Sequence, residues 1–410
     1  MQTRLSEGHS GTMDGERARE LIGACVHCGF CNATCPTYRL TGNELDGPRG
    51  RIYLMKQVFE GGPVSQLTRT HLDRCLVCRH CETTCPSGVQ YAELLDLGRR
   101  AVRTAAPRSW TQWVTRALLR SVLTSPAFGV FCRIGRIARP VLPARLRSLL
   151  APMPPIPAPR RRPHARRVLV PTGCVQPSLL PGIDAALQRI LDRLGIAAVS
   201  PDSGCCGAVH HHTDSEDGSL VRARRNIDAW WPLVADGVEA ILWTASACGL
   251  QARDYAKALA DDPAYAERAA RISALVTDPG EFLWRERALL LSLCEPATAE
   301  PVAFHAPCTL QHGLRQRLPV ESLLASLGAA LVPVANSSGC CGAAGTYAVL
   351  QRDLSKALGE AKRQDLMASA PARILSANIG CLLQLRAGAP VPVQHWLEWL
   401  AGRLKPEPSL

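Results

Sequence analysis

The sequence has no long uninterrupted run of apolar residues, and this absence argues against a simple membrane-spanning helix. No window of the chain approaches the roughly 18 consecutive apolar residues that such a helix needs. The N-terminal stretch MQTRLSEGHSGTMDGERARE is polar and lacks the apolar region of a secretory signal peptide. With 47% hydrophobic and 20% charged residues, the composition is that of a soluble globular protein. We therefore expect a cytoplasmic chain, in which clustered cysteines bind metal or carry out redox chemistry.

Acidic residues are missing from one segment of the chain. Residues 97–167 contain sixteen arginines and no Asp, Glu or Lys, so the net charge of +12 leaves −4 for the rest of the chain. Residues 105–165 mix these arginines with Trp, Leu and Phe and end in a Pro/Arg-rich linker. Such a basic amphipathic segment suits either peripheral contact with a membrane or packing on a partner subunit. No nucleic-acid motif accompanies it, so we expect no nucleic-acid binding.

Two further absences concern catalysis. No Gly-x-Gly-x-x-Gly follows a strand-like run, so no dinucleotide site is predicted. No Ser/His/Asp set and no carboxylate pair stands at catalytic spacing, and we assign no catalytic residue. A chain without a hydride-accepting cofactor is not expected to oxidise an alcohol by itself.

What the chain does have is eighteen cysteines, eight of which form a repeat. The spacing Cys-x2-Cys-x2-Cys-x3-Cys-Pro begins at Cys25 and recurs fifty residues later at Cys75. This run is typical of bacterial 4Fe–4S ligation, in which the fourth cysteine serves the other cluster, whereas structural zinc uses two separated Cys-x2-Cys pairs. The sequence therefore predicts two 4Fe–4S clusters, cluster 1 on Cys25, Cys28, Cys31 and Cys85, and cluster 2 on Cys75, Cys78, Cys81 and Cys35.

A second repeat fills the rest of the chain, and Ser-Gly-Cys-Cys-Gly-Ala occurs once in each half. Short apolar runs alternate with helical patterns, which favours two related α/β units with parallel sheets and with their thiols at the strand ends. The runs AILWTASAC and ARILSANIGC are predicted to be strands that end at a cysteine, and the histidines at 210–212 to lie in a solvated loop. A second site for metal or another cofactor is possible on Cys174, Cys205, Cys206 and Cys248, and on Cys308, Cys340, Cys341 and Cys381.

The predicted fold is α+β and multidomain: a mainly helical and loop-rich dicluster ferredoxin domain, followed by two α/β units. The predicted boundaries are 1–104 for the dicluster domain, 105–165 for the basic segment and linker, 166–295 for the first α/β unit and 296–410 for the second. Cys132 and Cys294 fit neither repeat and are expected to be buried thiols without a ligand.

The two Ser-Gly-Cys-Cys-Gly-Ala units resemble the cysteine-rich CCG domains of heterodisulfide reductase and related proteins. In heterodisulfide reductase such a domain carries an unusual cluster on five cysteines, the last two as Cys-x2-Cys. Here Gln251 and Gln384 stand where the fifth thiol would be. Thiol–disulfide redox catalysis is therefore an alternative that the sequence disfavours.

The whole chain resembles the iron–sulfur subunits of bacterial glycolate oxidases. The resemblance is carried by ACVHCGFCNATCPTY, ELDGPRGRIYLMKQV, LDRCLVCRHCETTCPSGV, NIDAWWP, FHAPCTLQH and SANIGC. It implies that FAD-containing partner subunits oxidise glycolate to glyoxylate, and that this chain passes the electrons towards a membrane quinone at the cytoplasmic face of the inner membrane. The corresponding subunits of lactate and anaerobic glycerol-3-phosphate dehydrogenases are the alternative branch.

Overall fold

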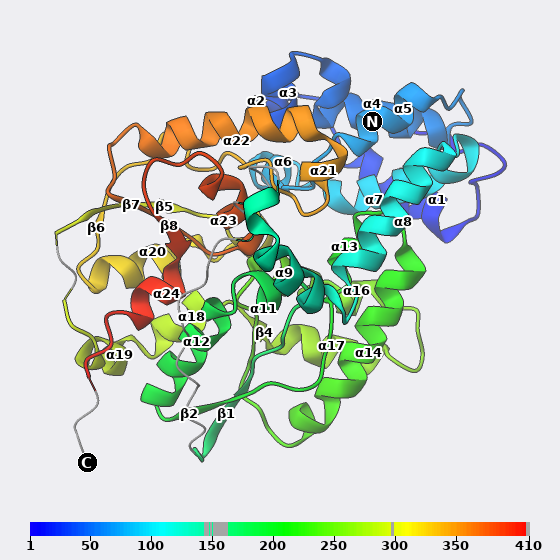
Figure 1. Ribbon diagram of the computed structural model, residues 1–410. Helices are drawn as coiled ribbons and strands as arrows, with labels where there is room; N and C mark the ends of the chain where they lie inside the picture. Colours follow the sequence, from blue (N-terminus) through cyan, green and yellow to red (C-terminus); the bar gives the residue numbers. More distant parts are fainter. Residues whose placement is uncertain (143–146, 148–149, 151–162, 297–298, 407–410) are drawn as a thin grey trace. The chain divides into compact units, whose positions relative to one another are not determined.

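A computed structural model describes residues 1–142, 147, 150, 163–296 and 299–406 (Figure 1). Most of the predicted Pro/Arg-rich linker lies outside these described residues. The chain forms two compact units. Unit 1 contains Met1–Thr115 and Ser338–Lys362, and unit 2 contains Arg116–Ser337 and Arg363–Leu410.

Unit 1 is built from short helices and loops around one apolar core. Its helices are α1 (Met13–Gly23), α2 (Phe30–Thr34), α3 (Pro36–Thr41), η1 (Glu44–Asp46), α4 (Pro48–Phe59), α5 (Gln66–Asp73), α6 (His80–Thr84), α7 (Tyr91–Ala105) and α21 (Tyr347–Leu350). Helices α8 (Trp110–Leu123) and α22 (Arg352–Met367) each run across a boundary between the units. Ile22, Met55 and Leu94 are fully buried where α1, α4 and α7 meet. This core supports the loops that carry the eight repeated cysteines.

Local sequence signals explain where several of these helices begin. Thr12 caps α1 by accepting a hydrogen bond from the Gly15 amide, and Ser65 forms a capping box with Thr68 at the start of α5. Pro36 and Pro48 stand at the first position of α3 and α4, where a missing N–H costs nothing. Cys35 thereby becomes the residue that precedes α3, which fixes its place at a helix N-terminus.

Unit 2 contains two four-stranded parallel sheets (Figure 1). Before the first sheet come α9 (Phe128–Ile137) and η2 (Arg139–Val141). The first half comprises β1 (Arg166–Leu169), α11 (Gln176–Leu179), α12 (Gly182–Arg193), β2 (Ile196–Val199), α13 (Ala208–His211), α14 (Glu216–Ala235), β3 (Ile241–Leu242), α15 (Ser246–Arg253), α16 (Tyr255–Ala258), α17 (Ala266–Leu275), β4 (Val276–Thr277), α18 (Pro279–Arg285) and α19 (Arg287–Leu293). The second half comprises β5 (Pro301–His305), the π-helix η3 (Thr309–Leu314), α20 (Arg317–Ser326), β6 (Ala330–Leu331), β7 (Arg373–Ser376), α23 (Ile379–Arg386), β8 (Val393–His395) and α24 (Trp396–Ala401).

The two sheets share one strand order. The first sheet runs β2-β1-β3-β4 and the second β6-β5-β7-β8, with every pairing parallel. Equal order in the two halves confirms the prediction of two related α/β units. Because a parallel sheet gathers the carboxyl ends of its strands at one edge, the loops after β1, β2 and β3 meet there.

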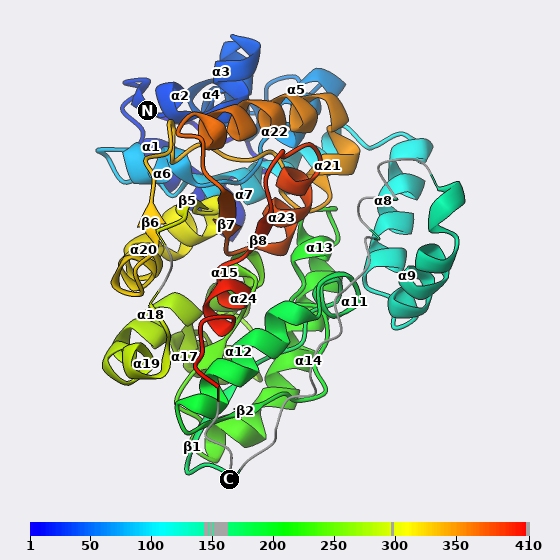
Figure 2. The ribbon, with the colours of Figure 1, turned by 60° about the vertical axis from the view of Figure 1, so that its left-hand side comes forward.

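The two halves of unit 2 pack on each other through paired elements. Helix α12 of the first half lies against α24 of the second (Figure 2). His395 lies 3.0 Å through its Nε2 from the carbonyl oxygen of Thr244, and the hydroxyls of Ser246 and Thr309 are 2.7 Å apart. His395 is fully buried, so this polar contact belongs to the interior between the halves.

One expectation about the strands is wrong. The apolar runs before Cys248 and Cys381 were expected to be strands up to the cysteine. Strand β3 instead ends at Leu242 and β7 at Ser376, and the cysteines lie in the first turn of α15 and α23. A short apolar run that continues from a buried strand into a buried helix shows no change of periodicity that would reveal the break.

Among the described residues, no single helix is long and apolar enough to cross a membrane. Helices α8 and α9 have the length and composition of a membrane-spanning segment only when they are taken together, and the chain bends by 88° between them.

Candidate metal centres

The four cysteines predicted for cluster 1 surround one cavity of unit 1. Three come from the loop before and within α2, and the fourth follows α6. Val26, Phe30 and Ile52 add apolar walls, and no Asp or Glu of the described residues lines the cavity. The cysteines facing this cavity are Cys25, Cys28, Cys31, Cys81 and Cys85.

The four cysteines predicted for cluster 2 surround a second cavity in the same unit. Cys35 reaches it from the end of α2, because α2 and α6 pack side by side. The lining cysteines are Cys35, Cys75, Cys78 and Cys81. Cys85 thus lies on the wall of the first cavity, Cys35 on the wall of the second, and Cys81 on both, while the ligation itself stays a prediction.

The fifty-residue repeat extends to the backbone of the two loops. His27 (φ 60°) and Gly29 (φ 86°) are left-handed in the first loop, and Val77 (φ 52°) and Arg79 (φ 58°) are left-handed at the matching positions of the second. A β-branched residue rarely adopts this conformation, so Val77 is a strained position. The left-handed residues lie on either side of the middle cysteine in each loop. The three closely spaced cysteines of each loop line the same cavity.

The chemistry of these donors fits an iron–sulfur group. Burial, with a smaller effect of the neighbouring thiols of Cys25, Cys28 and Cys85, raises the pKa of Cys31 to about 11. Burial likewise raises the pKa of Cys81 well above its usual value, with Cys78 and Cys75 adding to the effect. Several thiolates packed this closely need a compensating positive charge, which iron ions supply. His80 is half-buried and its pKa is lowered by burial, whereas His27 is exposed.

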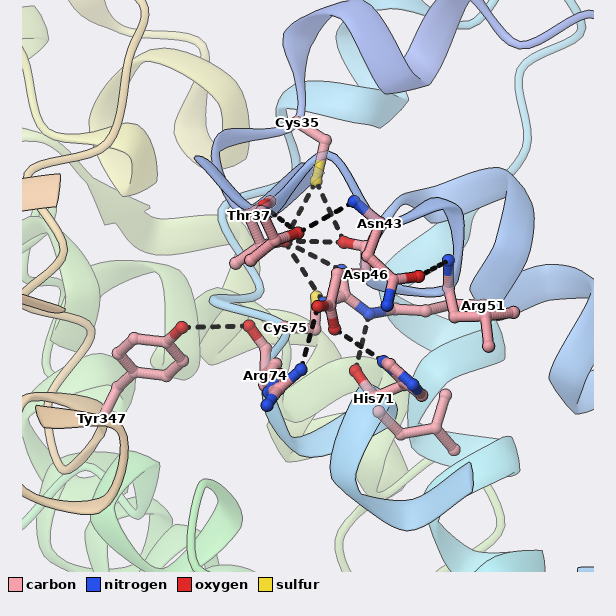
Figure 3. Close-up of polar contacts among 12 residues, drawn as sticks. Cys35, Thr37, Asn43, Asp46, Arg51, His71, Arg74, Cys75 and Tyr347 are labelled. Atoms are coloured by element: carbon pink, nitrogen blue, oxygen red, sulfur yellow. Dashed lines mark hydrogen bonds and ion pairs between the residues drawn. The ribbon is translucent and has the colours of Figure 1, made fainter. Parts of the chain in front are cut away.

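A buried charge network supports the second cavity, and the sequence analysis missed it (Figure 3). Asp46 is fully buried and receives His71 Nδ1 at 2.8 Å and Arg74 NH1 at 3.0 Å. Arg51, which is also buried, places its NH2 group 3.7 Å from the same carboxylate. Buried charges are retained where they are paired and hydrogen-bonded, and here the pairing fixes the loop that begins at Cys75.

The stretch ELDGPRGR, residues 44–51, contains Asp46 and Arg51 of this network. A Cβ atom on Gly50 would lie 2.1 Å from the carbonyl oxygen of Glu44, so only glycine fits there. Gly50 lets α4 approach η1 closely, which brings Arg51, a residue that lines the second cavity, to 3.7 Å from the Asp46 carboxylate. The signal in the sequence that could have revealed the network is the pair of glycines, Gly47 and Gly50, which flank Pro-Arg directly after acidic residues.

The four thiols of the first α/β half lie together in unit 2. Hydrogen bonds link Cys174 to Cys205, Cys205 to Cys206, and Cys206 to Cys248. The thiols of Cys174 and Cys206 together with the Gly207 amide stabilise the thiolate of Cys205 and lower its pKa, whereas the pKa values of Cys174 and Cys206 are raised. Cys174 follows β1, Cys205 and Cys206 follow β2, and Cys248 follows β3, so the carboxyl ends of three parallel strands bring the four thiols together.

The Cys205–Cys206 peptide is held by two buried side chains. Asn226 Nδ2 donates to the Cys205 carbonyl at 3.1 Å, and the Tyr255 hydroxyl donates to the Cys206 carbonyl at 2.8 Å. Trp230 stacks on Tyr255 with ring centroids 6.2 Å apart. Asn226 and Trp230 are both part of NIDAWWP, so this stretch serves to position the adjacent cysteines.

Glycine after each Cys-Cys pair allows a tight turn in both halves. Gly207 has φ +96° and its amide lies 3.4 Å from Cys205 Sγ, and Gly342 has φ +79° with its amide 3.4 Å from Cys340 Sγ. The cysteines of the second half are divided between the units: Cys340 and Cys341 belong to unit 1, and Cys308 and Cys381 to unit 2.

Three remaining sequence expectations concern single residues. Cys132 and Cys294 are buried, at 5% and 4% exposure, as expected for thiols outside the repeats. The prediction of a solvated loop at the three histidines is wrong, because His210 lies in α13 and is half-buried. Burial lowers its pKa.

Comparison with known proteins identifies both kinds of domain. A 4Fe-4S dicluster domain matches residues 22–89, and a cysteine-rich domain matches residues 168–253 and 302–386. The dicluster match supports two 4Fe–4S clusters as the cofactors, which the donor sets of the two cavities also fit.

Curated relatives extend this similarity to the whole chain. The chain is 46% identical to a glycolate oxidase iron–sulfur subunit of Escherichia coli (strain K12), over 99% of this chain and 100% of the relative. It is 30% identical to a probable glycolate oxidase iron–sulfur subunit of Bacillus subtilis (strain 168), over 89% of this chain and 88% of the relative. A lactate utilization protein A of Exiguobacterium is 25% identical but matches only 55% of this chain. The chain belongs to the family of glycolate oxidase iron–sulfur subunits, proteins that transfer electrons through iron–sulfur clusters.

Proposed function

We propose that the two cavities of unit 1 hold the two 4Fe–4S clusters in crossed ligation. The first cavity presents five thiols and the second four, in each case from both halves of the repeat, and this arrangement in a member of the family is the observation that carries the proposal. Such a cluster, when bound, accepts and releases one electron at a time. Cluster 1 would rest on Cys25, Cys28, Cys31 and Cys85, and cluster 2 on Cys75, Cys78, Cys81 and Cys35.

The chain would act as the electron-transfer subunit of a glycolate dehydrogenase complex. Oxidation of glycolate to glyoxylate releases two electrons and two protons, which an FAD-containing partner subunit takes up. The flavin then returns its electrons singly to this chain, which passes them towards a membrane quinone. The names of the relatives and the absence of a dinucleotide motif in the sequence support this division of labour.

Purification of the native complex through a tag on this chain tests the proposal. We expect the complex to contain FAD and to reduce a dye with glycolate but not with lactate or glycerol 3-phosphate. The iron-loaded chain alone should carry about eight irons in unit 1 and show no turnover. Glycolate turnover by the chain alone would contradict the proposal, and preference for lactate would assign the complex to the alternative branch.

The exposed face of α9 would bring the chain to the membrane. Phe131, Ile134 and Ile137 are 54%, 58% and 83% exposed and follow one another at helical spacing, while Cys132 between them faces the interior. Apolar side chains on one face of a basic helix are typical of interfacial binding. We extend this proposal to the location of the chain, which would be the cytoplasmic face of the inner membrane.

Vesicle sedimentation tests the membrane contact. We expect the chain to bind phosphatidylglycerol vesicles and to bind phosphatidylcholine vesicles weakly, because arginines favour anionic lipid. Ile134→Glu should weaken binding, whereas Val221→Glu, at an exposed position of α14, should not. Equal binding by both variants would exclude the α9 face.

The four linked thiols of the first α/β half would hold an additional metal ion or cluster. Their hydrogen bonds run in series from Cys174 through Cys205 and Cys206 to Cys248, so each sulfur donor of the set lies close to the next. Metal analysis of Cys206→Ser should show less bound metal than the unaltered chain, and Cys132→Ser should not differ from it. Equal metal in all three proteins, with a disulfide in the first half, would favour the thiol-redox alternative.

A further inference from the structure

The surroundings of the two predicted clusters differ at one pair of matched positions. Thr37 follows Cys35 by two residues, and the fifty-residue repeat places Ser87 at the same position after Cys85. Thr37 is 1% exposed, and its Oγ1 lies 3.2 Å from Cys35 Sγ (Figure 3). Among the residues that the structure describes, no hydrogen bond joins Ser87 to Cys85. The repeat therefore supplies a hydroxyl contact to one terminal cysteine only.

The Thr37 hydroxyl is oriented by its neighbours. Arg51 donates to Thr37 Oγ1 from both NH1 and NH2, at 3.2 Å each, so the oxygen acts there as an acceptor. Its single proton is left for the Asp46 carbonyl at 2.8 Å or for Cys35 Sγ. A cysteine that ligates iron is a thiolate and can only accept a hydrogen bond. The hydroxyl therefore stands ready to donate to Cys35 when the sulfur gains negative charge.

Arg51 adds a buried positive charge next to the same cavity. It is 1% exposed, lines the second cavity, and is held by a 2.7 Å bond from Nε to the His71 carbonyl. Burial lowers its pKa, but the nearby Cys75, Tyr91 and Cys35 raise it above its usual value, so the guanidinium stays charged. With Asp46 opposite Arg51 and Arg74, the three fixed charges sum to +1.

In the part of the chain that the structure describes, no buried arginine or lysine equivalent to Arg51 lines the first cavity. Ala101 occupies the position that matches Arg51 in the repeat. Arg49 lines the first cavity, but its Nε is bound to Glu44 Oε1 at 2.6 Å, which neutralises its charge locally. Both side chains of this ion pair are about one third or more exposed, so solvent screens it further.

The second cavity also adjoins the Cys-Cys loop of the second α/β half. Tyr347, six residues after Cys341, donates from its hydroxyl to the carbonyl of Arg74 at 3.1 Å, directly before Cys75 (Figure 3). Burial raises the pKa of Tyr347, and the thiols of Cys75 and Cys340 raise it further, which places both sulfurs near the same ring. These contacts lie within unit 1.

We propose that Thr37 and Arg51 hold the reduction potential of the cluster on Cys35, Cys75, Cys78 and Cys81 above that of the other cluster, and so make this site the outgoing end of the relay. Hydrogen bonds to a ligand sulfur and a nearby positive charge both favour the reduced state, which carries one more negative charge. One electron leaves the site that contains Cys25 and one electron enters the site that contains Cys35, with no proton transferred. The inference rests on the proposed ligation.

A redox titration of the full, iron-loaded chain, followed by electron paramagnetic resonance, tests this inference. Thr37→Val keeps the shape of the side chain and removes the hydroxyl. We expect it to lower the equilibrium constant for reduction of the higher-potential cluster about tenfold, a shift of about 59 mV for one electron. Thr37→Ser should restore the potential. Ser87→Ala, the matched change beside Cys85, should leave both potentials where they are.

The outcomes separate this inference from the proposed ligation. The iron content and the two cluster signals of every variant establish that both clusters are bound. If the unaltered chain lacked either cluster signal, the proposed ligation itself would be contradicted. If both clusters are bound and Thr37→Val shifts neither potential, or shifts the lower one, the inference is wrong. Arg51→Lys, which keeps the charge and loses the paired hydrogen bonds, should give a smaller shift in the same direction as Thr37→Val, and an opposite shift would also overturn it.

Discussion

The Tyr255 hydroxyl donates a 2.8 Å hydrogen bond to the carbonyl of Cys206, and it accepts a 2.9 Å bond from Asn226 Nδ2. Tyr255 is fully buried, so no water replaces either partner when the hydroxyl is removed. The turn that contains Cys205 and Cys206 therefore depends on the Tyr255 hydroxyl, which bonds the backbone carbonyl of Cys206 and not a thiol.

Removal of this hydroxyl should destabilise unit 2. Tyr255→Phe leaves the buried Cys206 carbonyl without this donor and leaves Asn226 Nδ2 with only its bond to the Cys205 carbonyl, which costs about 1–3 kcal/mol. The measurement is the urea midpoint of the chain followed by circular dichroism. Tyr265→Phe is the control, because Tyr265 bonds Asp228 at an exposed position and should lose little. Equal midpoints for the two variants would mean that the clamp on Cys206 does not support the fold.

Asp46 should be more important for stability than a surface carboxylate. Asp46→Asn removes a fully buried charge that faces His71, Arg74 and Arg51, and leaving the two arginines without this counter-charge should cost about 3–5 kcal/mol. Asp14→Asn removes an ion pair to Arg100 whose carboxylate is 52% exposed, and should cost less than about 1 kcal/mol. Urea midpoints of the two variants give the comparison. A smaller loss for Asp46→Asn than for Asp14→Asn would contradict the assigned role of the network.

The crossed grouping of the cysteines predicts which cluster each terminal cysteine affects. Cys35→Ser should perturb the signal of the cluster held by Cys75, Cys78 and Cys81, while Cys85→Ser should perturb the other one. The measurement is electron paramagnetic resonance of each reduced variant together with its iron content. If Cys35→Ser instead altered the cluster on Cys25, Cys28 and Cys31, the ligation would be uncrossed.

The grouping of the cysteines could largely be predicted from their spacing, whereas the side chains that surround and position them could not. The fifty-residue repeat predicts a set of four thiols for each cluster, since each loop and its Cys-Pro are local patterns, and the predicted members of each set line one cavity, with Cys81 on both walls. Thr37, Arg51 and Asp46 meet only through tertiary packing, and no local rule distinguishes a buried arginine from an exposed one. Cys248 was placed on a strand because apolar runs of strand and helix look alike over a few residues.

The pH dependence of stability should reveal Asp278, which caps α18 by accepting a 2.8 Å bond from the Gly280 amide. Burial raises its pKa to about 7, whereas an unfolded aspartate titrates near about 3.9. The folded state thus binds more protons between these values, and the stability from this group is complete below about pH 3.9 and is lost as the pH rises through about 7.

Asp278→Asn keeps a capping oxygen and removes the titration. The stability of this variant relative to the unaltered chain should therefore increase with pH from about 4 to 7, by up to about 1.4 kcal/mol per pH unit, and level off above. Asp236→Asn provides the control: Arg167 lowers the pKa of this exposed carboxylate, so its titration is complete at lower pH. The Asp236→Asn difference should stay flat between pH 5 and pH 7. A flat difference for Asp278→Asn as well would show that Asp278 is already ionised in the folded protein, because an ionised carboxylate has no proton left to lose in this range.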